Sequence, residues 1–155
     1  MGLALAPVNM TNEASTVEMT FESNLKYVEV AEDVVRGVCT TAGFEEEEEN
    51  KIEMAVHESL INAIWHGNKN DPAKQVWLQF QIFGDRLEIR VRDQGNGFDP
   101  DHVPDPLAEP NLLKVSGRGI FLIRAFMDEF HLRRLEPSGT EVLMVKYGVA
   151  PQKAT

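Results

Sequence analysis

Two polar residues, Glu58 and Asn62, interrupt an otherwise apolar helical pattern that runs from Glu53 to Asn70. A spacing of four residues places them about 40° apart on one face of a helix and roughly 6 Å apart along its axis. A carboxylate can accept a proton from a hydroxyl, and a carboxamide oxygen is a hard ligand for a hard cation. The pair indicates a site that binds a cation and activates a hydroxyl. Two surface residues on an amphipathic helix are an equal alternative from this helix alone.

A second chemical signal, Asp-Gln-Gly-Asn-Gly-Phe from Asp93 to Phe98, follows a predicted strand. The aspartate can accept a hydrogen bond from an exocyclic amine such as that of adenine. Gly95 and Gly97 lack a Cβ atom, so a ligand can lie against the backbone there. The same sequence is typical of a turn, and in isolation the turn is the favoured interpretation.

A third signal, Gly117-Arg118-Gly119, stands at the predicted start of a helix. The first N–H groups of a helix have no partner within the helix and attract anions such as phosphate. No Gly-Lys-Ser or Gly-Lys-Thr follows, so this segment is not a P-loop. A flexible helix start is an equal alternative for the segment alone.

The histidines raise a metal hypothesis that their spacing does not support. No second histidine stands four residues after His57, so the zinc-hydrolase pattern is absent. His66 fits a helix C-terminus, where an imidazole interacts favourably with the helix dipole. The run of glutamates from Glu45 to Glu49 fits a solvated helix start better than a cation-binding or docking patch.

Hydrophobic periodicity predicts the elements that position these residues. Alternating apolar residues predict strands, and apolar residues at helical spacing predict helices. The predicted order is a strand at 16–22, helices at 24–41 and 45–67, a hairpin at 76–83 and 87–91, a helix at 119–130, and a last hairpin at 131–135 and 141–147. This order predicts an α+β sandwich, in which a mostly antiparallel sheet is covered on one face by three helices.

Length and patterning predict a single domain at 16–147. We expect a mobile tail at 1–15 and a second tail at 148–155, because neither stretch has a hydrophobic period. The loop at about 98–118 contains four prolines and is long for a compact domain. Such a loop is typical of a functional lid or of disorder.

The composition bounds the partners and the compartment. With 15 basic and 25 acidic side chains, the 155 residues have a formal charge of −10. This charge argues against direct binding of nucleic acid and suits a partner with a basic surface. Cys39 is the single cysteine, and the sequence has no secretion signal and no apolar run of about 18 residues, so we expect a cytoplasmic protein.

In combination with Gly139-Thr140, the three signals resemble the Bergerat-fold (GHKL) ATPases. The matches are Glu58 and Asn62 to the N-box, Asp93 to Gly97 to the first glycine box, Gly117 to Gly119 to the second, and Gly139-Thr140 to a late Gly-Thr pair near the adenine. The stretches HESLINAIWHGN and GRGIFLIRAFMDEF resemble the small bacterial anti-sigma factor serine/threonine protein kinases. The resemblance extends from about Val17 to Lys146.

The resemblance implies a two-layer fold that binds ATP and Mg²⁺. It implies that Asn62 ligates the metal ion, that Glu58 is the general base, and that Asp93 binds the adenine amine with support from Thr140. The implied ATP-binding residues are Asn62, His66, Asp93, Gly95, Gly97, Phe98, Gly117, Arg118, Gly119 and Thr140. His66 and Asn68 are expected near the ribose and phosphates, and the proline-rich loop is expected to be the lid.

The function implied is transfer of the ATP γ-phosphate to a Ser or Thr of an anti-sigma factor antagonist (STAS-like) in a bacterial partner-switching pathway. A sigma factor is the second implied partner, and a homodimer is usual in the family. The alternative is a non-catalytic anti-sigma factor that senses nucleotide, which the acidic residues Asp101, Asp105 and Glu109 in the predicted lid favour. A scaffold that binds no ATP is the third hypothesis.

Overall fold

The computed structural model describes residues 14–95 and 118–150. In chain order the elements are β1 (Ser15–Glu22), η2 (Leu25–Tyr27), α1 (Val28–Ala42), α2 (Glu46–Ile61), η3 (Asn62–Gly67), β2 (Gln75–Ile82), β3 (Arg86–Arg92), α4 (Arg118–Phe126), β4 (Glu129–Arg134) and β5 (Thr140–Tyr147). The predicted lid up to residue 117 and most of the two predicted tails lie outside the described residues.

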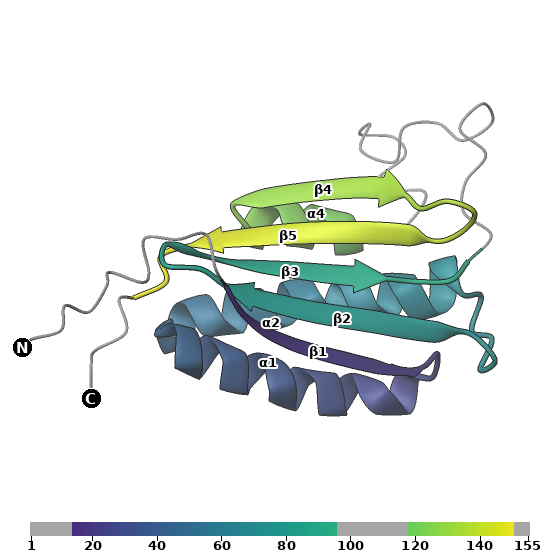
Figure 1. The fold of residues 1–155 in the computed structure, drawn as a ribbon, viewed down its shortest axis with the longest axis horizontal. Helices are drawn as coiled ribbons and strands as arrows, with labels where there is room; N and C mark the ends of the chain where they lie inside the picture. Colours follow the sequence, from purple (N-terminus) through teal and green to yellow (C-terminus); the bar gives the residue numbers. More distant parts are fainter. Residues whose placement is uncertain (1–13, 96–117, 151–155) are drawn as a thin grey trace, which may run out of the picture.

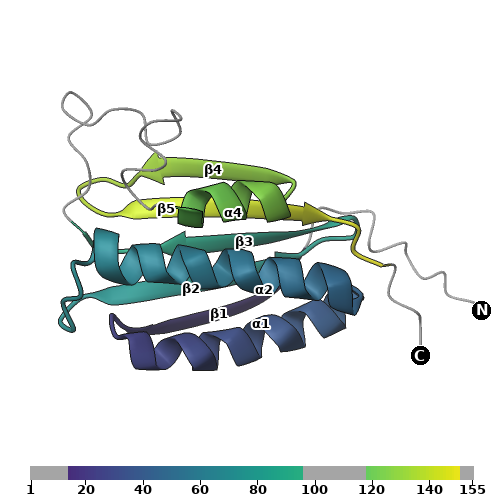
Figure 2. The same ribbon diagram turned by 180° about the vertical axis from the view of Figure 1, so that it is seen from behind.

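The five strands form one sheet in the order β1-β2-β3-β5-β4, and every neighbouring pair is antiparallel. Helices α1, α2 and α4 lie side by side on one face of this sheet, with α2 in the middle (Figures 1 and 2). The predicted α+β sandwich, with three helices on one face, is therefore confirmed.

Alternation along β2 and β3 builds the central part of the core. Leu78 and Phe80 of β2 and Leu87 and Ile89 of β3 are fully buried. Phe80 stands opposite Ile89 in the antiparallel register, so both side chains point to the helix-covered face. Strands β2 and β3 form the predicted hairpin, and their apolar residues share one face because successive residues of a strand point to opposite faces.

The helix predicted at 24–41 is present as the 3-10 turn η2 followed by α1, so the α-helix itself begins later than predicted and ends one residue later. The Asn24 side chain accepts a hydrogen bond from the Lys26 N–H and caps the short turn that leads into the helix. Gly43 adopts a φ of 87° and ends the helix by donating to the Cys39 and Thr40 carbonyls. Both signals are local, which explains why the sequence reveals them.

The glutamate run forms the start of α2, as the solvated-helix interpretation predicts. Glu46 to Glu49 occupy its first turn, where negative charge is favourable. Glu48 has a partner from another element, because its carboxylate lies 2.9 Å from Lys146 Nζ. Lys146 is only 7% exposed and also donates to the Phe126 carbonyl at 2.7 Å. This buried amine joins the start of α2 to the end of α4.

The helix predicted at 119–130 is too long, and the assignment of Phe130 to it is wrong. Helix α4 ends at Phe126, and β4 begins at Glu129. Phe130 stands opposite Met144 of β5 in the sheet. Its apolar side chain fits both a helical period and strand alternation, and pairing with β5 decides in favour of the strand.

The start of the predicted C-terminal tail packs against the domain. Val149 is 8% exposed and belongs to the core. The Ala150 N–H donates to the Ala42 carbonyl at 3.0 Å, which ties this segment to the end of α1. Among the described residues, no helix has the length and apolar character needed to cross a membrane.

Candidate functional site

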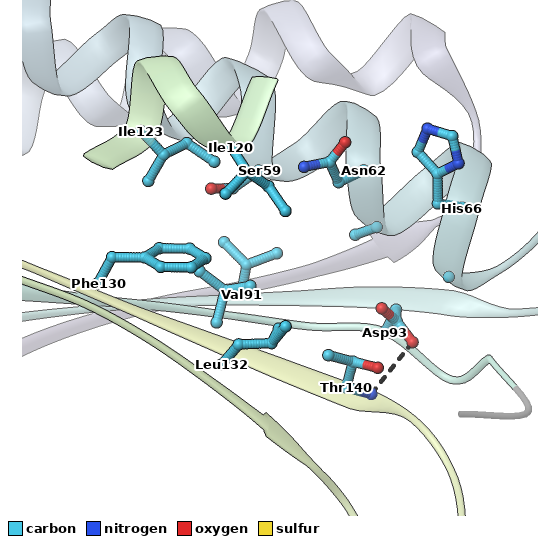
Figure 3. A pocket seen from close by; sticks show the side chains of 13 residues that line it. Ser59, Asn62, His66, Val91, Asp93, Ile120, Ile123, Phe130, Leu132 and Thr140 are labelled. Atoms are coloured by element: carbon cyan, nitrogen blue, oxygen red, sulfur yellow. Dashed lines mark hydrogen bonds between the residues drawn. The ribbon is translucent and has the colours of Figure 1, made fainter. Parts of the chain in front are cut away.

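A pocket lies between the helix layer and the sheet, beside the passage from α2 into η3 (Figure 3). It opens to solvent, and the empty space of about 580 Å³ at this position includes part of the open mouth. Its lining residues are Ser59, Asn62, Ala63, His66, Gly67, Val91, Asp93, Ile120, Ile123, Phe130, Leu132, Thr140 and Val142. A mostly apolar pocket with a few polar groups is typical of a small-molecule site.

Asp93 is the buried carboxylate of this pocket, with 8% of its surface exposed. Its Oδ1 accepts hydrogen bonds from the Gly95 N–H at 3.0 Å and the Thr140 N–H at 3.2 Å. No hydrogen bond to Oδ2 is formed within residues 14–95 and 118–150. Burial raises the pKa of Asp93, while the two backbone donors and the charge of Lys74 act in the opposite direction. The free oxygen can accept a hydrogen bond from a ligand amine.

Three glycines close around Asp93 and leave no room for side chains. A Cβ atom on Gly67 would collide with the Asp93 carboxylate, and one on Gly95 would collide with the Gly67 carbonyl oxygen. Gly139 has a φ of 101°, and a Cβ atom there would collide with the Asp93 carbonyl oxygen. The backbone of Gly67 is therefore what approaches Gly95 closely. Gly67, predicted only as a helix end, fixes the position of the Asp93 side chain.

The helix that carries Asn62 widens into a π-helix, η3, at that residue. The Asn68 N–H donates to the Ala63 carbonyl, five residues earlier, at 2.8 Å. Asn62 and His66 both line the pocket from this turn (Figure 3). The sequence predicts an ordinary helix through residue 67, because hydrophobic periodicity does not distinguish a single π-helical turn. Such turns are frequent at functional sites.

Glu58 and Asn62 face the start of α4. A Cβ atom on Gly119 would lie 3.0 Å from Glu58 Oε2 and 3.7 Å from Asn62 Oδ1. Gly119 is buried, and its lack of a side chain allows α4 to approach α2 at this point. The structure thus brings together three residues that the sequence singled out in two distant segments. Glu58 is half-buried where α2 contacts α4. The alternative that Glu58 and Asn62 are two surface residues of an amphipathic helix therefore does not describe Glu58.

The other predicted site residues are placed as follows. Thr140 begins β5, and its carbonyl accepts from the Asp93 N–H at 3.0 Å. Arg118 begins α4, next to Gly119. Gly97, Phe98 and Gly117 lie outside the described residues.

Asn68, expected near the ribose and phosphates, joins protein segments instead. It is fully buried, and its Nδ2 donates to the Gln75 carbonyl at 3.0 Å. Its Oδ1 accepts from the Gln94 N–H at 2.7 Å, so both ends of the carboxamide have protein partners. Asn68 therefore connects η3 to the ends of β2 and β3 and is absent from the pocket lining.

Sequence reasoning missed Ser59 and the apolar walls of the pocket. Ser59 is 1% exposed, and its hydroxyl donates to the Met144 sulfur at 3.1 Å. Val91, Ile123 and Leu132 form walls, and their periodicity marks them only as core. No local signal separates a pocket wall from a core residue, because both are apolar and face the same way.

The described part of the chain contains no group of three or more His, Cys, Asp or Glu side chains that could hold a metal ion. His57, considered for zinc, lies 2.5 Å from Glu32 of α1 through its Nδ1 atom. A hard cation beside Asn62 would take most of its ligands from a bound anion and from water, which is how Mg²⁺ is often held.

Comparison with known proteins gives a consistent assignment. Residues 21–146 match the family described as Histidine kinase-like ATPase domain. Serine-protein kinase RsbW of Bacillus subtilis (strain 168) is 32% identical over 150 residues, covering 89% of each chain. Serine-protein kinase RsbW of Staphylococcus epidermidis is 33% identical over 147 residues, covering 89% of this chain and 90% of the relative.

A solved structure is similar in fold. The crystal structure of the RsbU and RsbW domains of a Mycobacterium tuberculosis protein matches with a TM-score of 0.59 and 15% sequence identity. The match covers 90% of this chain and 35% of that longer chain. At this identity the likeness concerns the fold alone.

Proposed function

The chain belongs to the histidine kinase-like ATPase domain family, and we propose that it is an ATP-dependent serine/threonine protein kinase. Its substrate is a partner protein of the anti-sigma factor antagonist class. Relatives named serine-protein kinase are similar to the chain over 89% of its length. Phosphorylation of the antagonist would change the partners that the kinase can bind, which defines a partner-switching role with a sigma factor as the second partner.

The proposal rests on the meeting of Glu58, Asn62 and the start of α4 beside the pocket that contains Asp93. A kinase needs a pocket for the base of ATP, donors for its phosphates and a carboxylate for the acceptor hydroxyl. These three elements come from separate segments of the chain and lie at one end of the helix layer. A purely structural arrangement would not require a carboxylate, a carboxamide and a helix start to converge there.

The pocket has the chemistry to bind an adenine nucleotide. Oδ2 of Asp93 accepts from the exocyclic amine, and the Thr140 hydroxyl supports this contact. Apolar side chains, including Val91 and Leu132, cover the base. The start of α4, at Gly119, carries the positive end of the helix dipole and is suited to phosphate oxygens. His66 lies near the ribose and phosphates.

The same donor set suits Mg²⁺ that is shared between protein and nucleotide. The carboxamide oxygen of Asn62 would be the protein ligand, a neutral oxygen of the type that Mg²⁺ accepts. When bound, Mg²⁺ neutralises part of the charge on the phosphate oxygens.

Glu58 acts on the acceptor hydroxyl. Its carboxylate accepts the proton while the serine or threonine oxygen forms a bond to the γ-phosphorus. The bond between the γ-phosphorus and the bridging oxygen breaks, and ADP retains that electron pair. The products are the phosphorylated partner, ADP and a proton on Glu58 that passes to water.

The first experiment titrates ATP, with and without Mg²⁺, against wild type, Asn62→Ala and Asp93→Asn. We expect Mg²⁺ to increase the affinity of wild type, and this increase to be absent in Asn62→Ala. Asp93→Asn should weaken ATP binding at all Mg²⁺ concentrations. A wild type that binds no ATP would leave only a scaffold of this fold.

The second experiment measures phosphoryl transfer from ATP to purified anti-sigma factor antagonists. Glu58→Gln should lower kcat by about 10²- to 10⁴-fold with little change in ATP affinity. Glu53→Gln is the matched control, because Glu53 is a carboxylate on the same helix whose partner is Arg36. ATP binding without transfer by wild type, together with partner binding that persists in Glu58→Ala, would favour the nucleotide-sensing binding module instead.

A further inference from the structure

The outer surface of α2 carries exposed apolar side chains on both sides of Glu58. Met54 is 43% exposed and Trp65 is 52% exposed, whereas Ile61 is partly buried and packs against the core. Positions 54, 58 and 61 are spaced by four and three residues, which defines one face of α2, and Trp65 follows in the π-helical turn η3. We name Met54, Ile61 and Trp65 the α2 stripe.

The exposed members of the α2 stripe, Met54 and Trp65, lie on the outer side of the central helix, because α2 lies between α1 and α4 (Figure 2). The pocket lies on the other side of α2, towards the sheet. Glu58 connects the two surfaces, since its Oε2 reaches the start of α4 while its position belongs to the outer face. Exposed large apolar side chains on either side of a carboxylate are suited to contact a protein that presents its hydroxyl to that carboxylate.

We propose that the α2 stripe is the docking surface for the acceptor protein, and this inference rests on the proposed kinase function. The acceptor hydroxyl must come within hydrogen-bond reach of Glu58. The protein that supplies it must therefore cover the residues on either side of Glu58, which are apolar. The occupant is a segment with a serine or threonine between apolar side chains.

Helix geometry gives the spacing of this acceptor segment. Met54 lies about 6 Å from Glu58 along the axis of α2, and Trp65 lies in the opposite direction, within η3. An extended chain advances about 3.3 Å per residue. If the segment is extended along α2, the apolar residue that meets Met54 stands about two positions from the hydroxyl, on the same face of the extended chain.

Charge along α1 specifies the flank of the partner. Glu32 contacts His57 and Arg36 contacts Glu53, so α1 and α2 run antiparallel in close contact. Because residue 36 lies beside residue 53 and residue 32 beside residue 57, the exposed Glu29, about one turn earlier in α1, lies opposite the middle of the α2 stripe. With a formal charge of −10 on the whole chain, this side favours a basic residue on the acceptor.

The test measures steady-state phosphorylation of an antagonist protein as its concentration is varied, with wild type, Met54→Gln and Trp65→Gln. We expect KM for the antagonist to rise roughly tenfold in each variant, because exposed aromatic and apolar anchors dominate interface energies. The kcat and the ATP affinity should stay within about twofold, since neither side chain touches the pocket. Trp65→Phe keeps an apolar anchor and should largely restore KM.

Val30→Gln is the matched control. Val30 is 50% exposed on α1, and it is two residues from Glu32, which faces α2. Two residues correspond to about 200° of helix rotation, so Val30 points away from the α2 stripe. Its replacement by Gln should leave KM for the antagonist unchanged.

The outcomes separate the two proposals. If wild type phosphorylates none of the antagonists, the kinase function fails and the docking surface fails with it. If wild type is active and both Gln variants keep the wild-type KM, the docking surface alone is overturned. If Trp65→Gln turns a dimer into a monomer with an unchanged KM, a second copy of the chain covers the α2 stripe instead of the acceptor.

Discussion

Two buried carboxylates stand at the same end of the sheet, on opposite faces. Asp93 is 8% exposed and lies on the helix-covered face, and Glu141 is 4% exposed and lies on the outer face. Each is the chain neighbour of a residue that points the other way, because Arg92 precedes Asp93 and Thr140 precedes Glu141. The two positions therefore differ in their partners and hardly at all in burial.

The partners of Glu141 are two arginines. Its carboxylate lies 2.5 Å from Arg92 Nε and 2.8 Å from Arg133 Nε. Burial alone would raise the pKa of Glu141, but the hydrogen bonds and charges of Arg133 and Arg92 lower it. Arg92 is held in turn over the Trp77 ring, with its guanidinium carbon 4.1 Å from the ring centre.

Asp93 has no comparable charged partner among the described residues. Backbone N–H groups satisfy Oδ1, and burial raises the pKa of the side chain. A carboxylate with charged partners on both oxygens is complete and stabilises the sheet. A carboxylate that is buried without them is destabilising in the free protein and available to a ligand.

The largest expected effect comes from Asp93→Asn. We expect ATP affinity to fall about 10- to 100-fold, because a hydrogen bond to a charged acceptor contributes about 1.5–3 kcal/mol. The free energy of unfolding near pH 7 should not fall, since the change removes a buried charge. Calorimetric ATP titration and denaturant unfolding measure the two quantities. A loss of stability with unchanged affinity would remove the distinction between the two carboxylates.

The second prediction concerns Glu141→Gln, which should show the opposite pattern. The free energy of unfolding should fall by about 1–2 kcal/mol. This is a small loss for a buried carboxylate that loses its ion pairs, because both arginines reach solvent. ATP affinity should stay within about twofold. Urea unfolding and ATP titration of the same preparation check both parts, and a tenfold loss of affinity would contradict the assignment of Glu141 to structure.

The third prediction is the pH dependence of stability, for which the two groups have opposite signs. The contribution of Glu141 is present above its ordinary pKa of 4.5 and is lost as the pH falls through the lowered pKa of the folded state. Asp93 disfavours the fold above its raised pKa, and that penalty is relieved as the pH falls towards its ordinary pKa of 3.8.

Unfolding measured between about pH 6 and pH 3 distinguishes these signs. Relative to wild type, Glu141→Gln should show a shallower loss of stability on acidification, and Asp93→Asn should show a steeper one. Parallel curves for the three proteins would contradict both assignments.

The smallest expected effect is that of Trp77→Leu. Loss of the contact between the indole ring and Arg92 should lower the free energy of unfolding by about 0.5–1 kcal/mol, because the pair is partly exposed. ATP affinity should be unchanged, since Trp77 lies on the outer face. Thermal unfolding with and without ATP measures this, and a change in the stabilisation by ATP would show that the outer face influences the pocket.

The sequence predicted the parts of the site that depend on local spacing. A separation of four residues fixes Glu58 and Asn62 near one face of a helix. Alternation along residues 87–91 fixes the end of β3 before Asp93. Gly43 ends α1 because only a residue without a Cβ atom adopts its φ readily. These features depend on residues that are close in the sequence and not on tertiary packing.

Phe130 and Gly67 show where sequence reasoning is insufficient. Phe130 fits a helix or a strand, and only its position opposite Met144 assigns it to β4. Gly67 has the pattern of a helix end, yet its backbone packs against the Asp93 carboxylate. Ser59 and Glu141 gave no signal at all, because a buried polar residue is recognised only by its partners.

The amino-acid sequence by itself determined which chemical groups the site contains and which of them share an element, because periodicity acts over a few residues. The tertiary structure decided that Gly119 meets Glu58 and that Gly67 closes on Asp93. Those meetings join segments dozens of residues apart, so they depend on strand pairing and helix packing over the whole sheet. The same pairing placed one carboxylate between arginines and left the other free to bind.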